Sequence, residues 1–321
     1  MPLATRVTKL LAIEHPILLA PMDIVSGGRL AAAVTAAGGL GVIGGGYGDR
    51  DWLDGAFTDA GNARVGCGFI TWSMAKKPRL LDRALARRPA AIILSFGDPA
   101  PFARPNHEAG AKLICQVQDL EQARQAADAG ADIIVAQGSE GGGHGLTRAT
   151  MTLVPAVADA FSTIPVVAAG GIADGRGLAA ALMLGADGVM LGTRFYASQE
   201  AEGHARAKQR ILEATGDDSV RSLVFDITRR NVWPTGHTGR VLRNAHTERW
   251  LGREAELAQN LDEEARRYND ARASADFNIA AVIAGEAAGL IHDIPSAAEI
   301  VERMVSEAEA QLARCAALAR P

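Results

Sequence analysis

Short apolar segments recur along the chain, and longer, partly polar segments separate them. Eight of the short segments are apolar throughout instead of alternating, which is typical of parallel strands buried on both faces. They lie at residues 17–20, 41–43, 65–70, 91–95, 112–117, 133–137, 166–169 and 189–191. Strands that alternate with helices predict an α/β protein with a parallel sheet.

Most segments between these strands carry helical spacing. The sequence predicts helices at residues 29–37, 78–88, 120–129, 153–161, 177–184 and 200–214, whereas 51–60 and 100–110 give no clear pattern. Gly38, Gly130 and Gly185 each stand between a helix and a strand, as helix C-termini favour. Eight strands within the first 195 residues fit a TIM (β/α)8 barrel better than a doubly wound sheet.

The pattern changes after residue 215. Between Arg221 and Arg253, seven arginines stand against only Asp226 and Glu248, and a helical, acidic stretch follows at 254–272. Such a basic segment is usually a solvated face, but it could also attract an anionic substrate or a dinucleotide phosphate. The segment does not continue the βα repeat, so we interpret it as an insertion.

The chain therefore divides into a barrel at residues 1–215 and 276–321 and an inserted substrate or lid subdomain at 216–275. A final helix is predicted after Ser296, which forms a capping-box pattern with Glu299. That helix carries an apolar stripe, which indicates that the helix packs back on the barrel. The stripe consists of Val301, Val305, Ala308, Leu312 and Cys315.

Composition and charge exclude several classes of protein. The net charge of −4 argues against a general nucleic-acid binder, which needs a basic excess. Cys67, Cys115 and Cys315 have no metal-ligand or disulfide spacing, and no metal site is predicted. No stretch approaches 18 uninterrupted apolar residues, so no membrane span is expected. We expect a cytoplasmic protein.

Two neighbouring strands end in glycine loops. Gly170 and Gly171 follow the strand at 166–169, and Gly192 and Thr193 follow the strand at 189–191. Bare backbone N–H groups beside helix N-termini bind anions. Because the loops after strands seven and eight of a TIM barrel often hold a phosphate, a phosphate site is predicted here.

A third loop carries a histidine. After the strand at 133–137, three consecutive glycines precede His144. They let backbone approach a ligand closely and place the histidine on a loop outside the core. The alternative is a flexible loop with an incidental histidine. At the carboxyl face of a barrel, such a histidine suits a general base or a charge stabiliser.

One glycine motif is misleading. Residues 39–44 match the dinucleotide-binding pattern GxGxxG, but these glycines enter and run through a strand instead of following it. A Rossmann interpretation is therefore disfavoured.

These pieces together resemble the nitronate monooxygenase family, also known as 2-nitropropane dioxygenase-like flavoproteins. The resemblance spans nearly the whole chain. The matching segments are residues 16–22, 36–41, 137–144, 169–175, 190–195 and 284–292.

The resemblance implies a TIM barrel that binds one FMN non-covalently, with a lid-like second domain. By that resemblance, His144 would be the active-site histidine and the phosphate would be held by Gly170, Gly171, Gly192 and Thr193. Other residues would contact the flavin or its ribityl chain or hydrogen-bond the cofactor: Pro21, Met22, Gly68, Gln116, Gln137, Gly142 and Gly143.

The implied reaction is oxidation of an alkyl nitronate by O2 to a carbonyl compound and nitrite. His144 would stabilise the nitronate charge, or abstract the α-proton of a bound nitroalkane. Gly145 and Glu286 depart from residues that are common in the family. A carboxylate at Glu286 that pointed toward the flavin would disfavour an anionic substrate.

Two alternatives stay open. An NAD(P)H-dependent flavin reductase, acting on a quinone or on an enoyl-acyl-carrier protein, would use the same fold and cofactor. A non-catalytic binder of flavin or another phosphate ligand would use the same glycine loops. The oligomeric state is also open, with a homodimer as one candidate.

Overall fold

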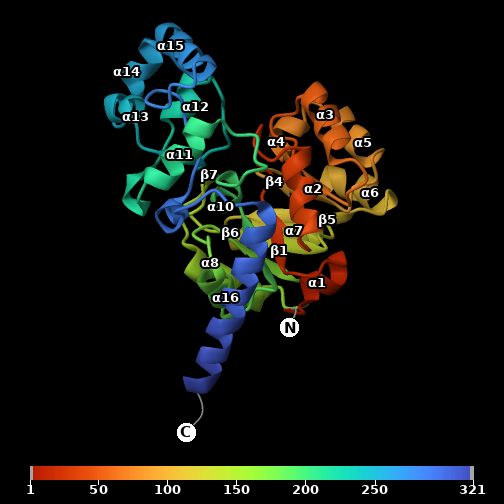
Figure 1. Ribbon diagram of the computed structural model, residues 1–321. Helices are drawn as coiled ribbons and strands as arrows, with labels where there is room; N and C mark the ends of the chain where they lie inside the picture. The colour runs from red at the N-terminus through yellow and green to blue at the C-terminus, as the bar shows by residue number, and fades with distance from the viewer. Residues whose placement is uncertain (1–2, 319–321) are drawn as a thin grey trace.

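The computed structural model describes residues 3–318 and is built around a closed parallel barrel (Figure 1). Its strands occur in the order β1-β9-β8-β6-β5-β4-β3-β2. A parallel bridge between Leu18 and Leu40 joins the two ends of this order, with Leu19 donating to the Leu40 carbonyl at 2.9 Å. The predicted TIM barrel is confirmed. The strands are β1 (Ile17–Leu19), β2 (Val42–Gly44), β3 (Gly66–Ile70), β4 (Ala91–Ser95), β5 (Lys112–Val117), β6 (Ile133–Gln137), β8 (Val166–Ala169) and β9 (Gly188–Leu191).

The strands form because their side chains are buried on both faces, as the unbroken apolar segments predicted. Ile17, Ile92, Ile134 and Val167 are fully buried. Glycines in residues 39–44 allow close packing, since a Cβ on Gly41 would lie 1.7 Å from the Ala31 carbonyl oxygen. Close packing, not dinucleotide binding, explains that motif.

Helices surround the barrel wall. The two segments without a clear pattern, 51–60 and 100–110, are largely helical as α3 and α6. The helices of this layer are α1 (Arg6–Leu11), α2 (Gly28–Ala36), α3 (Arg50–Ala60), α4 (Thr71–Met74), α5 (Arg79–Leu85), α6 (Ala100–Glu108), α7 (Leu120–Asp128), α8 (Thr150–Ala160), α9 (Gly175–Met183), α10 (Thr193–Tyr196) and α11 (Ala205–Glu213).

The segment after α11, from η1 to α15, is called the inserted segment below and forms a group of short elements. Figure 1 shows its helices α12–α15 gathered away from the helices around the barrel. Two small apolar clusters lie within it, one around Phe225 and Tyr268 and one around Trp250. A division of the chain at residues 216 and 275 stays a prediction. The elements are η1 (Gly216–Asp218), β10 (Ser219–Ser222), α12 (Val224–Thr228), β11 (Thr238–Leu242), α13 (Ala245–Trp250), α14 (Glu254–Gln259) and α15 (Leu261–Ala273).

This segment is tied to the barrel by a second sheet of order β10-β11-β7, in which β7 (Gly143–Gly145) belongs to the loop after β6. The pairing is antiparallel, with His144 opposite Gly239. The alternative of a flexible loop around His144 does not hold, because Gly143–Gly145 form a strand that pairs with β11.

The chain returns to the barrel through η2 (Glu286–Leu290) and α16 (Ala297–Leu318), and α16 packs on α9 and α2. Its predicted capping box is present, with the Ser296 N–H donating to Glu299 Oε2 at 2.9 Å. Val301, Val305 and Ala308 of the predicted stripe are buried, but Cys315 is exposed, so the stripe ends earlier than predicted. Among residues 3–318, no helix is long and apolar enough to cross a membrane.

Candidate functional site

A cavity of about 790 Å³ opens at the carboxyl ends of the barrel strands. The twelve site residues predicted from the sequence all line it: Pro21, Met22, Gly68, Gln116, Gln137, Gly142, Gly143, His144, Gly170, Gly171, Gly192 and Thr193. Their roles stay predictions, but the barrel does bring them together around one space.

The loops after β8 and β9 form a glycine cradle in this cavity. Gly170 and Gly171 have φ values of +97° and +74°, which side chains rarely adopt. Within the described part of the chain, the N–H groups of Gly170, Gly171, Gly192 and Thr193 donate no hydrogen bond. Thr193 is also the first residue of α10. The cradle consisting of these four residues therefore has free donors for an anion.

The other wall of the cavity includes the ends of β1 and β3. A Cβ at Gly68 would lie 2.4 Å from the Pro21 side chain, so glycine is needed for this close approach. Ser26 accepts from the Met22 N–H at 2.7 Å and holds that turn.

Amide side chains lie at the ends of β5 and β6. Gln116 and Gln118 both donate to Gln137 Oε1, at 2.7 and 3.0 Å. Gln118 was not predicted, and it does not line the cavity. Its contact orients Gln137, whose NH2 group remains available as a donor.

His144 is buried and lies between the barrel and the inserted segment. Both carboxylate oxygens of Asp226, on α12, lie 2.9 Å from its Nε2. Trp233 stacks on the imidazole at 3.4 Å between ring centroids, with an interplanar angle of 8°. Burial lowers the pKa of His144 below its usual 6.5, although Asp226 acts in the opposite direction.

An aromatic cluster surrounds Trp233. Its ring makes edge contacts with Tyr47, Trp72 and Phe96, and its Nε1 donates to the Tyr47 hydroxyl at 3.2 Å. Phe96 follows β4 with φ +64°, a strained conformation for a bulky residue. Because Tyr47, Phe96 and Trp233 line the cavity, they shape the space next to His144.

Two arginines of the inserted segment hold the loop that carries His144. Arg221 donates to the carbonyl oxygens of Ser139, Gly141 and Gly145, and Arg240 donates to Ser139. Burial lowers the pKa of Arg221 to about 10. These side chains are therefore positioned by structure and are not free to bind a substrate.

Glu286, one of the two departures from the family pattern, pairs with Arg240 at 2.9 Å. It is not among the residues that line the cavity. The carboxylate therefore does not face the site, and its predicted effect on an anionic substrate does not apply.

Five further polar or basic residues line the cavity: Arg229, Arg230, Arg272, Asn231 and Asn269. Arg272 is exposed and forms no ion pair with the described residues. Of the seven arginines noted in the sequence, only Arg229 and Arg230 line this cavity.

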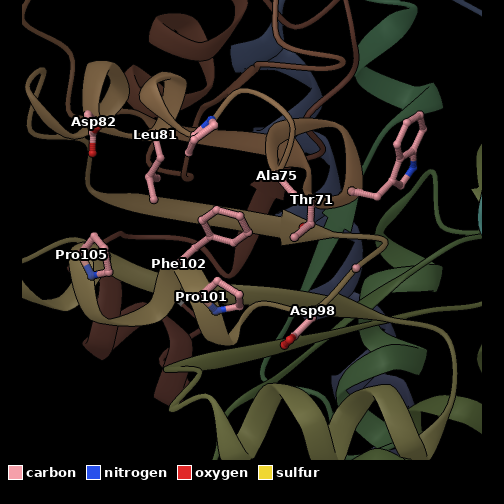
Figure 2. A pocket seen from close by; sticks show the side chains of 11 residues that line it. Thr71, Ala75, Leu81, Asp82, Asp98, Pro101, Phe102 and Pro105 are labelled. Atoms are coloured by element: carbon pink, nitrogen blue, oxygen red, sulfur yellow. The ribbon is translucent and has the colours of Figure 1, made fainter.

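A separate slot of about 580 Å³ lies on the outside of the barrel between α5 and α6 (Figure 2). Leu81, Pro101 and Phe102 face it from the two helices, and Thr71 lies at one end. None of the twelve predicted residues lines this slot. The chemistry-bearing groups are gathered in the larger cavity instead.

The fold and the cavity together define a TIM-barrel protein with an anion cradle and a buried histidine at the carboxyl face. The family model for nitronate monooxygenase matches residues 4–64 and 69–307. The chain belongs to the nitronate monooxygenase family, and it is an oxidoreductase.

Individual relatives match this chain over most of their length, and a solved structure shares its fold. A nitronate monooxygenase of Neurospora crassa is 32% identical, with 95% of this chain and 92% of the relative covered. A 5-hydroxy-7a-methyl-1-oxo-octahydroindene-4-carboxyl-CoA dehydrogenase of Mycobacterium tuberculosis is 31% identical over 99% of both chains. The solved structure of FabK from Thermotoga maritima aligns with a TM-score of 0.87 at 34% identity, covering 98% of this chain and 99% of that one.

Sequence reasoning missed Asp226, Trp233 and Phe96. Asp226 left one signal, since it is an isolated acid in an arginine-rich stretch, and such a residue often has a specific partner. Trp233 and Phe96 carried no pattern that separates a site aromatic from a core aromatic.

Proposed function

We propose that the protein is an FMN-dependent enzyme that oxidises alkyl nitronates with O2 to a carbonyl compound and nitrite. One observation carries the proposal: the glycine cradle and buried His144 lie along the same cavity. Membership of the family and the relative from Neurospora crassa support it.

The cavity fits FMN in its chemistry. A phosphate dianion needs several N–H donors, and the cradle has four without a partner in the described chain. The nearby Glu140 carboxylate does not compete, because it accepts from the Thr150 N–H and hydroxyl, each at 2.9 Å. Cradle residues would hold the phosphate, and Gln116 and Gln137 would hydrogen-bond the cofactor.

When bound, FMN would supply the redox chemistry between the substrate and O2. Pro21, Met22 and Gly68 would support the cofactor from one wall, and Gly142 and Gly143 would lie close to it. His144 would contact the substrate, and the aromatic cluster around Trp233 would exclude water from it.

The absorbance spectrum of the purified protein, followed by nitrite release from a nitronate, tests the proposal. We expect flavin bands, or their appearance after reconstitution with FMN. His144→Ala should keep the bands but lower nitrite release from the parent nitroalkane about 100-fold or more, since that substrate must lose its α-proton and acid–base groups contribute roughly 10²–10⁴. A colourless protein that cannot be reconstituted would contradict the proposal.

A second candidate is an NAD(P)H-dependent reductase on the same cofactor. One basic residue of the cavity lining favours it, because Arg272 is exposed, has no ion pair with the described residues and could bind a phosphate group of a nucleotide. The relative from Mycobacterium tuberculosis is named as a dehydrogenase of a CoA ester, which also carries phosphates. Anaerobic mixing separates the two: bleaching by NADH or NADPH supports a reductase, and bleaching by nitronate alone supports the main proposal.

A further inference from the structure

We infer that Asp226 is a positioning residue that keeps His144 protonated on Nε2 and leaves the Nδ1 lone pair facing the cavity. With its proton on Nε2, the ring would have the free lone pair that the α-proton abstraction implied by the family resemblance requires, and Asp226 would be the residue that sets this state. The choice of substrate rests on the proposed function, whereas the protonation of the ring does not.

The contact between Asp226 and His144 assigns the ring proton. Both carboxylate oxygens lie 2.9 Å from Nε2, and a carboxylate can only accept hydrogen bonds. Nε2 must therefore carry the hydrogen. Asp226 is 3% exposed, and Arg229 donates to its Oδ1 at 3.2 Å, so a second residue orients the carboxylate.

Nδ1 is left as the reactive nitrogen. No described residue hydrogen-bonds to it, and it is not among the buried polar atoms that lack a partner. Because His144 lines the cavity and its Nε2 is taken by Asp226, we assign Nδ1 to the side of the ring that meets the cavity. The stacked Trp233 ring fixes the plane of the imidazole, so the lone pair has one direction.

The charged groups around His144 are Asp226, Arg229 and Arg221. Burial and the two arginines lower the pKa of the ring, and Asp226 partly offsets them. The ring is therefore neutral near pH 7 and has a free lone pair on Nδ1. A neutral ring cannot donate a hydrogen bond from Nδ1 to an anionic nitronate.

The proton-transfer step is balanced within the site. Nδ1 takes the α-proton of the nitroalkane, the C–H bond breaks, and its electron pair moves onto the nitro group to give the nitronate. The imidazolium that forms is stabilised by the Asp226 carboxylate at Nε2. Solvent later removes the proton from Nδ1 and restores the base.

Nitrogen-15 NMR of the imidazole in the cofactor-free protein at pH 7.5 tests the ring assignment, with His144→Asn to identify the signals. We expect a protonated Nε2 and an unprotonated Nδ1. In Asp226→Asn, the amide can donate to Nε2, so the share of the Nδ1–H form should rise.

Activity measurements on Asp226→Asn extend the test. We expect kcat/KM for a neutral nitroalkane to fall at least about 100-fold, because a base in the wrong tautomer is ineffective, and for preformed nitronate to fall less than about fivefold. Asp226→Glu should restore part of the loss. The matched control is Asp270→Asn, an exposed position on α15 outside the cavity lining.

A ring protonated on Nδ1 in the wild-type protein, or equal losses for the two substrates, would overturn the inference. The NMR result decides the tautomer even if Asp226→Asn fails to fold, because it is obtained on the wild type. Absence of nitrite from both substrates would contradict the proposed function and leave the tautomer assignment standing.

Discussion

Gly170 and Gly171 decide whether the cradle can form. Their positive φ values place their N–H groups in the loop between β8 and α9, and a Cβ on Gly170 would lie 2.9 Å from the Gly138 carbonyl oxygen. The backbone conformation and the lack of space act together, so no other residue suits the position.

Replacing Gly170 by alanine should weaken FMN binding about tenfold or more. A side chain at this φ costs about 1–2 kcal/mol, and 1.4 kcal/mol corresponds to a tenfold change in Kd. Quenching of flavin fluorescence measures the affinity. Gly55→Ala is the matched control, because Gly55 lies in α3 with no atom within 4 Å of an added Cβ. An unchanged Kd in Gly170→Ala would contradict the role of the cradle.

The glycines at the strand ends could be placed at the cavity from sequence, because glycine pairs at that position have a local physical reason. Asp226 and Trp233 could not, because each acts through a contact with a residue about 80–90 positions away, as the separation of 82 between Asp226 and His144 shows. Such contacts depend on how two distant segments meet.

Among the elements, β7 shows the same limit. The eight barrel strands were predictable since each is apolar and needs only its own sequence. Gly143, His144 and Gly145 have low strand propensity, and they form a strand only because β11 pairs with them. The segments of α3 and α6 gave no clear helical pattern, partly because Gly55 and Pro105, which disfavour helices, lie within them.

The helices α12, α13 and α15 meet at a second buried histidine, His246. Thr228 donates its hydroxyl proton to the Val224 carbonyl, so it accepts from His246 Nε2 at 2.8 Å. His246 Nδ1 has no hydrogen-bond partner among the described residues. Burial lowers the pKa of His246 to about 4, although Glu264 acts in the opposite direction.

This pKa predicts acid sensitivity. The folded pKa lies below the unfolded value of about 6.5, so the stabilisation is complete above pH 6.5 and is lost as the pH falls toward 4. Between pH 7.5 and pH 5, His246 should account for about 2 kcal/mol of lost unfolding free energy. Urea unfolding of wild type and His246→Gln at both pH values measures the difference.

The variant should lose less stability on acidification than the wild type. His292→Gln, at an exposed position, should behave as the wild type does. Equal pH dependence in wild type and His246→Gln would show that His246 is not buried in its neutral form.

At the scale of the whole molecule, α16 completes the barrel wall after the inserted segment. It buries Ile300, Val301, Met304 and Val305 against the rest of the core. At about 1.5–3 kcal/mol for each large apolar side chain, these four contribute roughly 6–12 kcal/mol. That amount is comparable to the whole stability of a typical domain, about 5–15 kcal/mol.

The effect of C-terminal truncation on folding should therefore change sharply within α16. Removing residues 297–321 should prevent folding, whereas removing residues 313–321 should leave the melting temperature within about 2 °C, since residues 313–318 are exposed. Circular dichroism on heating checks both. A folded protein without residues 297–321 would contradict the role given to α16.

The sheet that joins β7 to β11 has a consequence for how molecules enter. A hinged opening of the inserted segment would have to break the pairing at His144 and displace Arg221 from three carbonyl oxygens of the loop. Rotation of side chains such as Trp233 breaks far fewer contacts and occurs on much shorter timescales. Entry of molecules into the cavity should thus depend on rotation of aromatic side chains such as Trp233, while the β7–β11 pairing stays in place. Small substrates should therefore enter more readily than bulky ones.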